Sequence, residues 1–334
     1  MRPDLPVVLT LGDPAGIGPE IALKAWRRLG GEVPFVLLAD PSRLAPLAER
    51  LAIPLREVAA PGEAAGAADR EALAVLPHPL PAAPEPGQPD PANAPAIVAM
   101  IERGTILVRA GEALALCTNP INKKALKDGA GFAFPGHTEF LAHLSGADLP
   151  VMMLAAPGIR VVPVTIHIPL AAVPAALTPE LLEATLRIVH AAGRADLGLD
   201  RPRIAVAGLN PHAGEEGAMG SEEHTVIIPV LDRLRAEGMA LTGPHPADTM
   251  FHPEARSRYD IAVCMYHDQA LIPIKTIDFA GGVNVTLGLD FVRTSPDHGT
   301  AYDIAGRDRA DPSSLVAALR LAHELGQRRQ GSVR

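Results

Sequence analysis

Short apolar runs alternate with segments of helical periodicity along most of the chain. The run PVVLTLG, for example, precedes PEIALKAWRRLG, in which Ile21, Ala25, Trp26 and Leu29 fall on one face of a helix. Thr178, which is followed by a proline, marks the start of another helix, because threonine caps helices and proline suits their first turn. Continuous apolar strands that alternate with helices are typical of an α/β fold with a mostly parallel sheet. We therefore expect an α/β protein.

Length and charge narrow the functional classes. The 334 residues are enough for two domains of ordinary size or for one large α/β unit. The net charge of -8 and the pI near 5.8 argue against a nucleic-acid partner, which needs a basic face on the protein. Local basic clusters remain able to bind a small anion.

The cysteines and the apolar stretches indicate the compartment. Cys117 and Cys264 lie in apolar runs and lack a CxxC spacing, so we interpret them as reduced, buried thiols. The amino-terminal segment lacks the features of a signal peptide, and the most apolar later stretch is interrupted by prolines and a histidine. We therefore expect a soluble, cytoplasmic protein without a membrane span.

Three histidines follow apolar, strand-like runs. His167 ends VVPVTIH, His212 follows IAVAGLNP, and His267 ends IAVCMYH. In open α/β sheets, ligands gather outside the carboxyl ends of the strands, where side chains from separate strands converge. Any one of these histidines alone is better explained by a hydrogen bond that caps its strand. The three together favour a divalent-cation site with open positions for a substrate.

Several polar residues in apolar surroundings are candidates for binding an anion. Thr138, which follows His137 in FPGHTEFLA, is a plausible helix cap, and free amides at a helix start favour an anion. A capped helix with an incidental histidine is nearly as good an interpretation. Lys275, Asn284 and Arg293 interrupt apolar segments further along. Each cation is either a surface residue with a buried stem or a partner for a phosphate or carboxylate.

Two glycine-rich segments join strands to helices. GLNPHAGEEGAMGSEE is either a mobile lid or a long connection whose acidic end suits the next helix. TLGDPAGIGPE has glycines at 12, 16 and 18, which is not the GxGxxG order of a Rossmann fingerprint. Asp13 is either functional or a residue that holds this turn.

A set of motifs spread over the chain resembles one family. The segments GDPAGIGPE, TNPINK, PGHTEF, GLNPHAGEEGAMGSEE, PADTMF, MYHDQALIPIK, GGVNVTLGLDFVRTSPDHGTA and DIAGR together closely resemble the 4-hydroxythreonine-4-phosphate dehydrogenases of vitamin B6 biosynthesis. The likeness runs from the first strand to the last helix, and the motifs are long enough to be specific.

The resemblance implies an architecture. We expect an isocitrate/isopropylmalate-dehydrogenase-like α/β fold with two α/β/α domains and an active-site cleft between them. Residues 1–135 plus 270–334 would form a discontinuous cofactor-side domain, and residues 136–269 a metal and dimerisation domain. The resemblance also implies a homodimer whose active site lies at the subunit interface.

The resemblance also implies roles for individual residues. The ligands of one divalent cation per site (Zn, Mg or Co) would be His167, His212 and His267. The substrate contacts would be His137, Thr138, Lys275, Asn284 and Arg293. Asp248 and Asp268 match acidic positions near the substrate, where either could be the catalytic base or could orient a metal-bound histidine.

The cofactor is implied by a further likeness. DHGTAYDIAGRDRADP is similar to the loop that holds the adenosine part of NAD in the isopropylmalate dehydrogenase class. This likeness places His298, Gly299, Thr300 and Asp303 near NAD or NADP, between which the sequence does not distinguish.

The implied reaction is the oxidation of 4-hydroxythreonine 4-phosphate to a β-keto acid that loses carbon dioxide. A related dehydrogenase of threonate or erythronate 4-phosphate, or of an aromatic dihydrodiol acid, is the nearest alternative. A metal-dependent hydrolase and a non-catalytic metal- or phosphate-binding protein are more distant ones.

Overall fold

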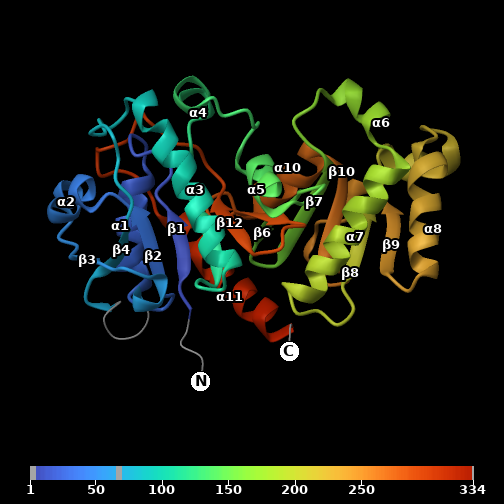
Figure 1. Cartoon of the computed structure of the whole chain (residues 1–334). Helices are drawn as coiled ribbons and strands as arrows, with labels where there is room; N and C mark the ends of the chain where they lie inside the picture. The colour runs from blue at the N-terminus through green and yellow to red at the C-terminus, as the bar shows by residue number, and fades with distance from the viewer. Residues whose placement is uncertain (1–4, 65–69, 333–334) are drawn as a thin grey trace. The chain divides into compact units, whose positions relative to one another are not determined.

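The structure is a computed structural model that describes residues 5–64 and 70–332. The chain divides into two compact units. Unit 1 contains the described residues of 1–148 together with 289–330, and unit 2 is built on residues 149–288. Unit 1 runs from blue to green and returns in red in Figure 1, and unit 2 runs from green to orange.

Unit 1 contains parallel strands whose carboxyl ends lie at one edge. Its strands are β1 (Val7–Thr10), β2 (Phe35–Ala39), β3 (Leu55–Glu57), β4 (Leu73–Pro77), β5 (Ala115–Thr118) and β12 (Arg293–Pro296). Their order is β3-β4-β2-β1-β5-β12, and every neighbouring pair is parallel. The side chains of β1, β2 and β5 are buried, as expected for strands with helices on both faces.

Unit 2 combines parallel and antiparallel strands. Its strands are β6 (Val151–Ala156), β7 (Ile159–Thr165), β8 (Arg203–Ala207), β9 (Ala240–His245), β10 (Ile261–Tyr266) and β11 (Val283–Leu287), in the order β11-β6-β7-β10-β8-β9. β6 is antiparallel to both of its partners within the unit, whereas β7, β10, β8 and β9 are parallel. The carboxyl ends of β7, β10 and β8 therefore lie at the same edge.

Helices connect the strands in both units. Those of unit 1 are α1 (Gly18–Leu29), α2 (Pro41–Arg50), α3 (Ala94–Arg109), α4 (Lys123–Ala130), α5 (His137–Ser145) and α11 (Ser313–Ser332). Those of unit 2 are α6 (Val173–Ala176), α7 (Pro179–Ala195), α8 (Ile228–Ala236), α9 (Pro253–Arg256) and α10 (His267–Ile277). This alternation confirms the α/β fold that the hydrophobic pattern predicts.

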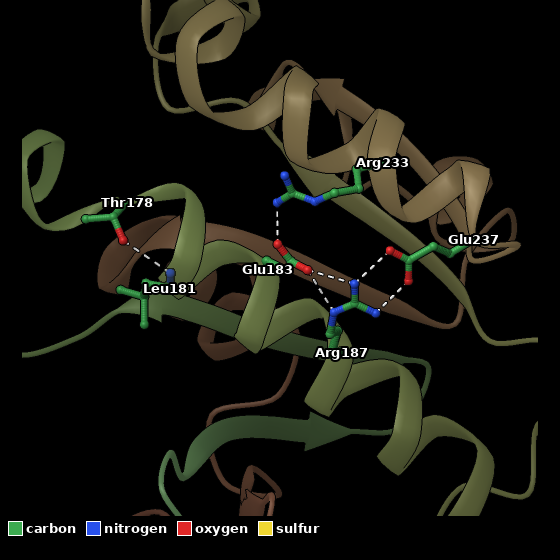
Figure 2. Close-up of polar contacts among 6 residues, drawn as sticks. All are labelled: Thr178, Leu181, Glu183, Arg187, Arg233 and Glu237. Atoms are coloured by element: carbon green, nitrogen blue, oxygen red, sulfur yellow. Dashed lines mark hydrogen bonds and ion pairs between the residues drawn. The ribbon is translucent and has the colours of Figure 1, made fainter.

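The local predictions for α1 and α7 can be compared with the structure directly. Ile21, Ala25 and Leu29 are buried on the inner face of α1, whereas Trp26 is only half-buried. Thr178 caps α7: its hydroxyl oxygen accepts a hydrogen bond from the backbone N–H of Leu181 at 3.2 Å (Figure 2). The structure thus confirms the cap of α7 and, apart from Trp26, the buried face of α1.

The boundaries of the compact units differ from the expected domain boundaries. Residues 136–148 belong to unit 1 because α5 packs against α3. Residues 270–288 belong to unit 2, because α10 packs on β7 and β10 and β11 pairs with β6. The expected roles of the two domains stay predictions.

Within the described residues, no helix is both long and apolar enough to cross a lipid bilayer.

Candidate functional site

The three histidines predicted to bind a cation follow parallel strands of unit 2. The register pairs Tyr266 of β10 with Thr165 of β7, so the segments that follow these residues lie beside each other. The rings of His167 and His267 are accordingly close, with centroids 5.7 Å apart. His212 follows β8, the other neighbour of β10, in the turn η5 (Pro211–Gly217).

A single chain brings two of the three predicted ligands together. Among the described residues, no three His, Cys, Asp or Glu side chains are grouped closely enough to hold a metal ion. The three-histidine site stays a prediction, and it requires a further donor beside His167 and His267.

Two of these histidines have a strained backbone. His167 has φ 56° and His212 has φ 52°, in the left-handed region that residues other than glycine rarely occupy. The left-handed conformation continues after His212 through residues 213–216. Each non-glycine residue in this region costs about 1–3 kcal/mol and persists only where its surroundings impose it. Such strain gathers at functional sites, which favours a functional role for both segments.

Asp268 contacts the ring of His267. Its Oδ1 lies 2.7 Å from Nδ1 of His267. An ionised carboxylate only accepts hydrogen bonds, and an Nδ1–H donated to it would leave the lone pair of a neutral imidazole on Nε2. This arrangement is the one that orients metal-binding histidines in other proteins.

Two cavities lie on either side of Tyr266 and Asp268. One, of about 300 Å³, is lined by His167, His267 and the segment after β7. The other, of about 420 Å³, is lined by Asp248, Phe251 and residues of α10. Tyr266 and Asp268 line both cavities. The exposed Asp248 thus shares a cavity with Asp268.

The glycine-rich segment after β8 is held in place by a buried carboxylate. Glu223, which is 1% exposed, accepts hydrogen bonds at 2.8 Å from the backbone N–H groups of Leu209 and Asn210. Its other oxygen accepts from the side-chain amide of Asn210 at 2.9 Å. These bonds fix the beginning of the segment, at residues 209 and 210.

Unit 1 places His137 beside positive charge. His137 is the first residue of α5, and Arg293, only 3% exposed, begins β12 and donates a hydrogen bond to Thr118 Oγ1 at 2.7 Å. Burial lowers the pKa of His137 well below its usual value, and the charges of Arg293 and Lys123 lower it further. Burial also lowers the pKa of Arg293, to about 10, so Arg293 stays charged at neutral pH. A neutral imidazole next to two cations suits an anionic ligand.

Thr138 does not cap its helix. The N-cap of α5 is Gly136, which has no side chain to accept a hydrogen bond, and Thr138 lies inside the first turn. The prediction of Thr138 as a cap was therefore wrong by two positions. Lys123 was missed as a candidate, although the motif TNPINK contains it.

The remaining predicted substrate residues, Lys275 and Asn284, lie in unit 2. Lys275 is in the last turn of α10, with its Nζ 5.3 Å from the centroid of the Phe279 ring. Asn284 is on β11.

Some residues predicted to contact a ligand have buried polar atoms for which the described part of the chain supplies no hydrogen-bond partner. They are Nε2 of His137, Oδ1 of Asn284 and Nε2 of His298. Buried polar atoms in native proteins are nearly always hydrogen-bonded, so each such atom needs a partner from elsewhere. A bound ligand at each of these side chains would supply its missing partner.

The predicted cofactor loop packs against the turn after β1. The carbonyl oxygen of Thr300 accepts a hydrogen bond from the N–H of Ile17 at 3.0 Å, and a side chain at Gly16 would lie 2.9 Å from that oxygen. Tyr302 donates a hydrogen bond to Asp13 Oδ2 at 2.6 Å. Asp13 also accepts from the N–H of Ala15. Asp13 therefore holds its own turn and the loop that contains His298, Gly299, Thr300 and Asp303.

Comparisons with known proteins identify the family. Residues 32–322 match the family described as pyridoxal phosphate biosynthetic protein PdxA. The chain belongs to the PdxA family. It is 61% identical over 329 residues to a 4-hydroxythreonine-4-phosphate dehydrogenase from Paracoccus denitrificans, covering 97% of this chain and 98% of the relative. A protein of the same name from Ruegeria sp. is 56% identical over 97% of this chain and 98% of its own length.

Solved structures agree with the PdxA assignment. A 4-hydroxythreonine-4-phosphate dehydrogenase from Klebsiella pneumoniae superimposes with a TM-score of 0.89 at 38% identity, over 97% of this chain and 100% of that chain. A terephthalate 1,2-cis-dihydrodiol dehydrogenase from Burkholderia xenovorans is less similar, with a TM-score of 0.68 at 32% identity over 96% and 98% of the two chains. As a PdxA protein, the chain is an oxidoreductase of pyridoxal phosphate biosynthesis.

Proposed function

We propose that this chain oxidises 4-phosphooxy-L-threonine (4-hydroxythreonine 4-phosphate) with NAD or NADP. The product is 2-amino-3-oxo-4-(phosphooxy)butanoate, which loses carbon dioxide to give 3-amino-2-oxopropyl phosphate. The observation that carries the proposal is the 61% identity, over 97% of the chain, to a relative named for this activity.

The phosphate end of the substrate fits the positive residues. Arg293 and Lys123 supply charge, and the neutral His137 supplies a hydrogen bond through its buried Nε2. The family resemblance assigns substrate contacts to Lys275 and Asn284 of unit 2 as well. Holding a remote anionic group aligns the reacting carbon with the nicotinamide, and alignment of this kind is worth several powers of ten in rate. The cofactor itself would be held by His298, Gly299, Thr300 and Asp303, on the loop that Asp13 and Tyr302 fix.

The donor chemistry at the end of β10 fits a divalent cation. His167 and His267 present imidazoles close together, with Nε2 of His267 left as a lone-pair donor by Asp268. Together with His212 they would hold Zn²⁺, Mg²⁺ or Co²⁺. Such an ion, when bound, supplies Lewis-acid stabilisation of negative charge on a substrate oxygen.

The carboxylates of Asp248 and Asp268, the two candidates for the catalytic base, have different surroundings. Asp268 is engaged by the ring of His267, which gives it an orienting role. Asp248 lines the larger neighbouring cavity. We therefore assign Asp248 as the candidate base for the hydroxyl proton.

We also propose that the enzyme is a homodimer with its active site at the subunit interface. Among the described residues, the exposed large apolar side chains lie mainly in unit 2, and several follow the predicted metal ligands: Ile168, Leu170, Ile272, Ile277 and Phe279. Leu170 is 68% exposed and Phe279 79% exposed. A second copy of the chain would cover these side chains and bring the third predicted histidine to the cation across the interface.

The proposal is tested by following nicotinamide reduction with purified enzyme. NAD or NADP should be reduced with 4-phosphooxy-L-threonine, and faster than with threonate 4-phosphate, erythronate 4-phosphate or an aromatic cis-dihydrodiol acid. EDTA should abolish turnover, and Zn²⁺, Co²⁺ or Mg²⁺ should restore it. Faster reduction with another substrate would reassign the activity. Hydrolysis without any change in nicotinamide absorbance would indicate a hydrolase.

A further inference from the structure

Three consecutive backbone positions after β8 are fixed by side chains from elsewhere in unit 2. The side-chain amide of Gln269, in the first turn of α10, donates a hydrogen bond to the carbonyl oxygen of Gly208 at 2.8 Å. Glu223 accepts from the N–H groups of Leu209 and Asn210. Gln269 also accepts from the N–H of Met265 at 2.7 Å, so it joins the end of β10 to the end of β8. The contacts therefore link the segments that carry His267 and His212.

The glycines near Glu223 could not be replaced by residues with a side chain without a clash. A side chain at Gly214 would lie 2.6 Å from Glu223 Oε2, and one at Gly208 would lie 2.8 Å from the Cα of Ala213. The carboxylate is thus enclosed by the turn that it supports. Glu223 itself lies in the π-helical turn η6 (Glu223–Ile227) that precedes α8.

The left-handed turn explains why such a support is needed. Residues 212–216 all have positive φ, and four of the five are not glycine. The conformation is unfavourable for these residues by themselves, so contacts outside the turn must impose it. A buried carboxylate that accepts three N–H donors provides charge-assisted hydrogen bonds, which are stronger than neutral ones.

We propose that Glu223 is a positioning residue: it holds the segment that carries His212 so that this histidine can bind the cation. Gln269 connects the same segment to α10. This inference rests on the proposed function, because it assigns His212 to the cation. Glu223 touches neither the substrate nor the cation in this account, and it acts only through the backbone of residues 209 and 210.

The chain offers a matched control at the opposite end of the same strands. Asp260 precedes β10 and accepts hydrogen bonds from the backbone N–H and the guanidinium of Arg203, at the start of β8. Asp260 and Glu223 are therefore both carboxylates that bind backbone N–H groups next to β8. Only Glu223 binds the segment that carries His212, so Asp260→Asn tests general loss of stability in unit 2.

The experiment is a Co²⁺ titration of the full-length, demetallated enzyme, with a melting curve for each variant. Glu223→Gln should bind Co²⁺ about 10–100-fold more weakly than the wild type, the range found when groups that orient metal ligands are removed. Asp260→Asn should lower the melting temperature and leave the Co²⁺ affinity unchanged. In a His212→Ala background, Glu223→Gln should cause little further loss, because the two substitutions act through one ligand.

The outcomes separate this inference from the proposed function. Wild-type Co²⁺ affinity in a folded Glu223→Gln variant would overturn the positioning role, as would equal losses in Glu223→Gln and Asp260→Asn. An undiminished effect of Glu223→Gln in the His212→Ala background would overturn it too. A wild-type enzyme that binds no Co²⁺ would refute the metal part of the proposed function, and this inference with it. If Glu223→Gln does not fold, Gln269→Ala takes its place, with the same expected loss of affinity.

Discussion

The two ends of the neighbouring strands β8 and β10 are built differently. At the amino ends, Asp260 and Arg203 pair through backbone and side-chain hydrogen bonds, including one of 2.8 Å between the guanidinium and the carboxylate. At the carboxyl ends lie His267, whose ring faces that of His167, and the left-handed turn that begins at His212.

The difference indicates which end serves stability and which serves function. At the amino ends, polar groups satisfy one another and the backbone is relaxed. At the carboxyl ends, the left-handed turn after β8 has an unfavourable backbone conformation, which the rest of the fold must stabilise. The imidazoles of His167 and His267 line a cavity there. Open α/β sheets place ligands outside the carboxyl ends of their strands, and the cation site that we propose in unit 2 would follow this rule.

The largest expected effect comes from removing a histidine at the carboxyl ends. His167→Gly and His167→Ala should each weaken Co²⁺ binding by more than about 100-fold, since removal of a ligand should exceed the loss caused by removing its supports. His167→Gly should nevertheless be more stable than His167→Ala by about 1 kcal/mol, because glycine tolerates the left-handed φ of 56°. Titration with Co²⁺ and denaturant unfolding measure the two effects.

His190 provides the control for this substitution. It lies on α7, in the part where a side chain at Gly193 would contact Ile261 at the amino end of β10, so His190→Ala should leave the Co²⁺ affinity unchanged. If His167→Ala bound Co²⁺ as tightly as His190→Ala, the carboxyl ends would not be the cation site. If His167→Gly were less stable than His167→Ala, the backbone strain would be absent in solution.

Much of the fold could be predicted from the sequence, because periodicity reports burial directly. The helical face of Ile21, Ala25 and Leu29 and the cap at Thr178 depend on residues close in the chain, and both are confirmed. The proximity of His167 and His267 follows from a general rule for parallel strands and did not require knowledge of the register.

Other features depend on contacts between distant residues and could not be predicted. Nothing in the local sequence distinguishes the buried Glu223 from its less buried neighbours in GSEEH, because its role comes from N–H groups 13 and 14 positions earlier. Thr138 was expected to cap α5, but the helix begins one residue before it, with glycine as the cap. The contact of Asp13 with Tyr302 joins positions 289 residues apart, and only the folded chain shows it.

A smaller effect is expected at the amino ends, where Asp260→Asn should destabilise the protein by about 1–2 kcal/mol through the loss of charge-assisted hydrogen bonds. The exposure of Arg203 limits the effect. The hydrogen bond from Arg203 is the main cause of the lowered pKa of Asp260. A lowered folded-state pKa stabilises the protein above the unfolded pKa, and this stabilisation is lost as the pH falls through the folded value. At neutral pH, the wild type should thus unfold at a higher urea concentration than Asp260→Asn.

The same measurement in acid completes the test of Asp260. Below the folded pKa of Asp260, wild type and Asp260→Asn should unfold at more similar urea concentrations, because both carry an uncharged side chain. A difference that stayed constant over the whole pH range would show that packing of the side chain, and not its charge, is responsible.

The smallest effect is expected from the ion pairs between α7 and α8, which lie away from both strand ends. Figure 2 shows Glu183 between Arg187 and Arg233, with Arg187 also bound to Glu237 at 2.6 Å. Because these side chains are partly exposed, Glu183→Gln should lower the melting temperature only slightly, and added salt should remove the difference. The arginines lower the pKa of Glu183, so its contribution to stability should also disappear as the pH falls below the usual glutamate range.

Glu254→Gln, which breaks a single exposed pair with Arg258, should have a still smaller effect. A larger effect for Glu254→Gln would show that the network on α7 and α8 adds nothing beyond separate pairs.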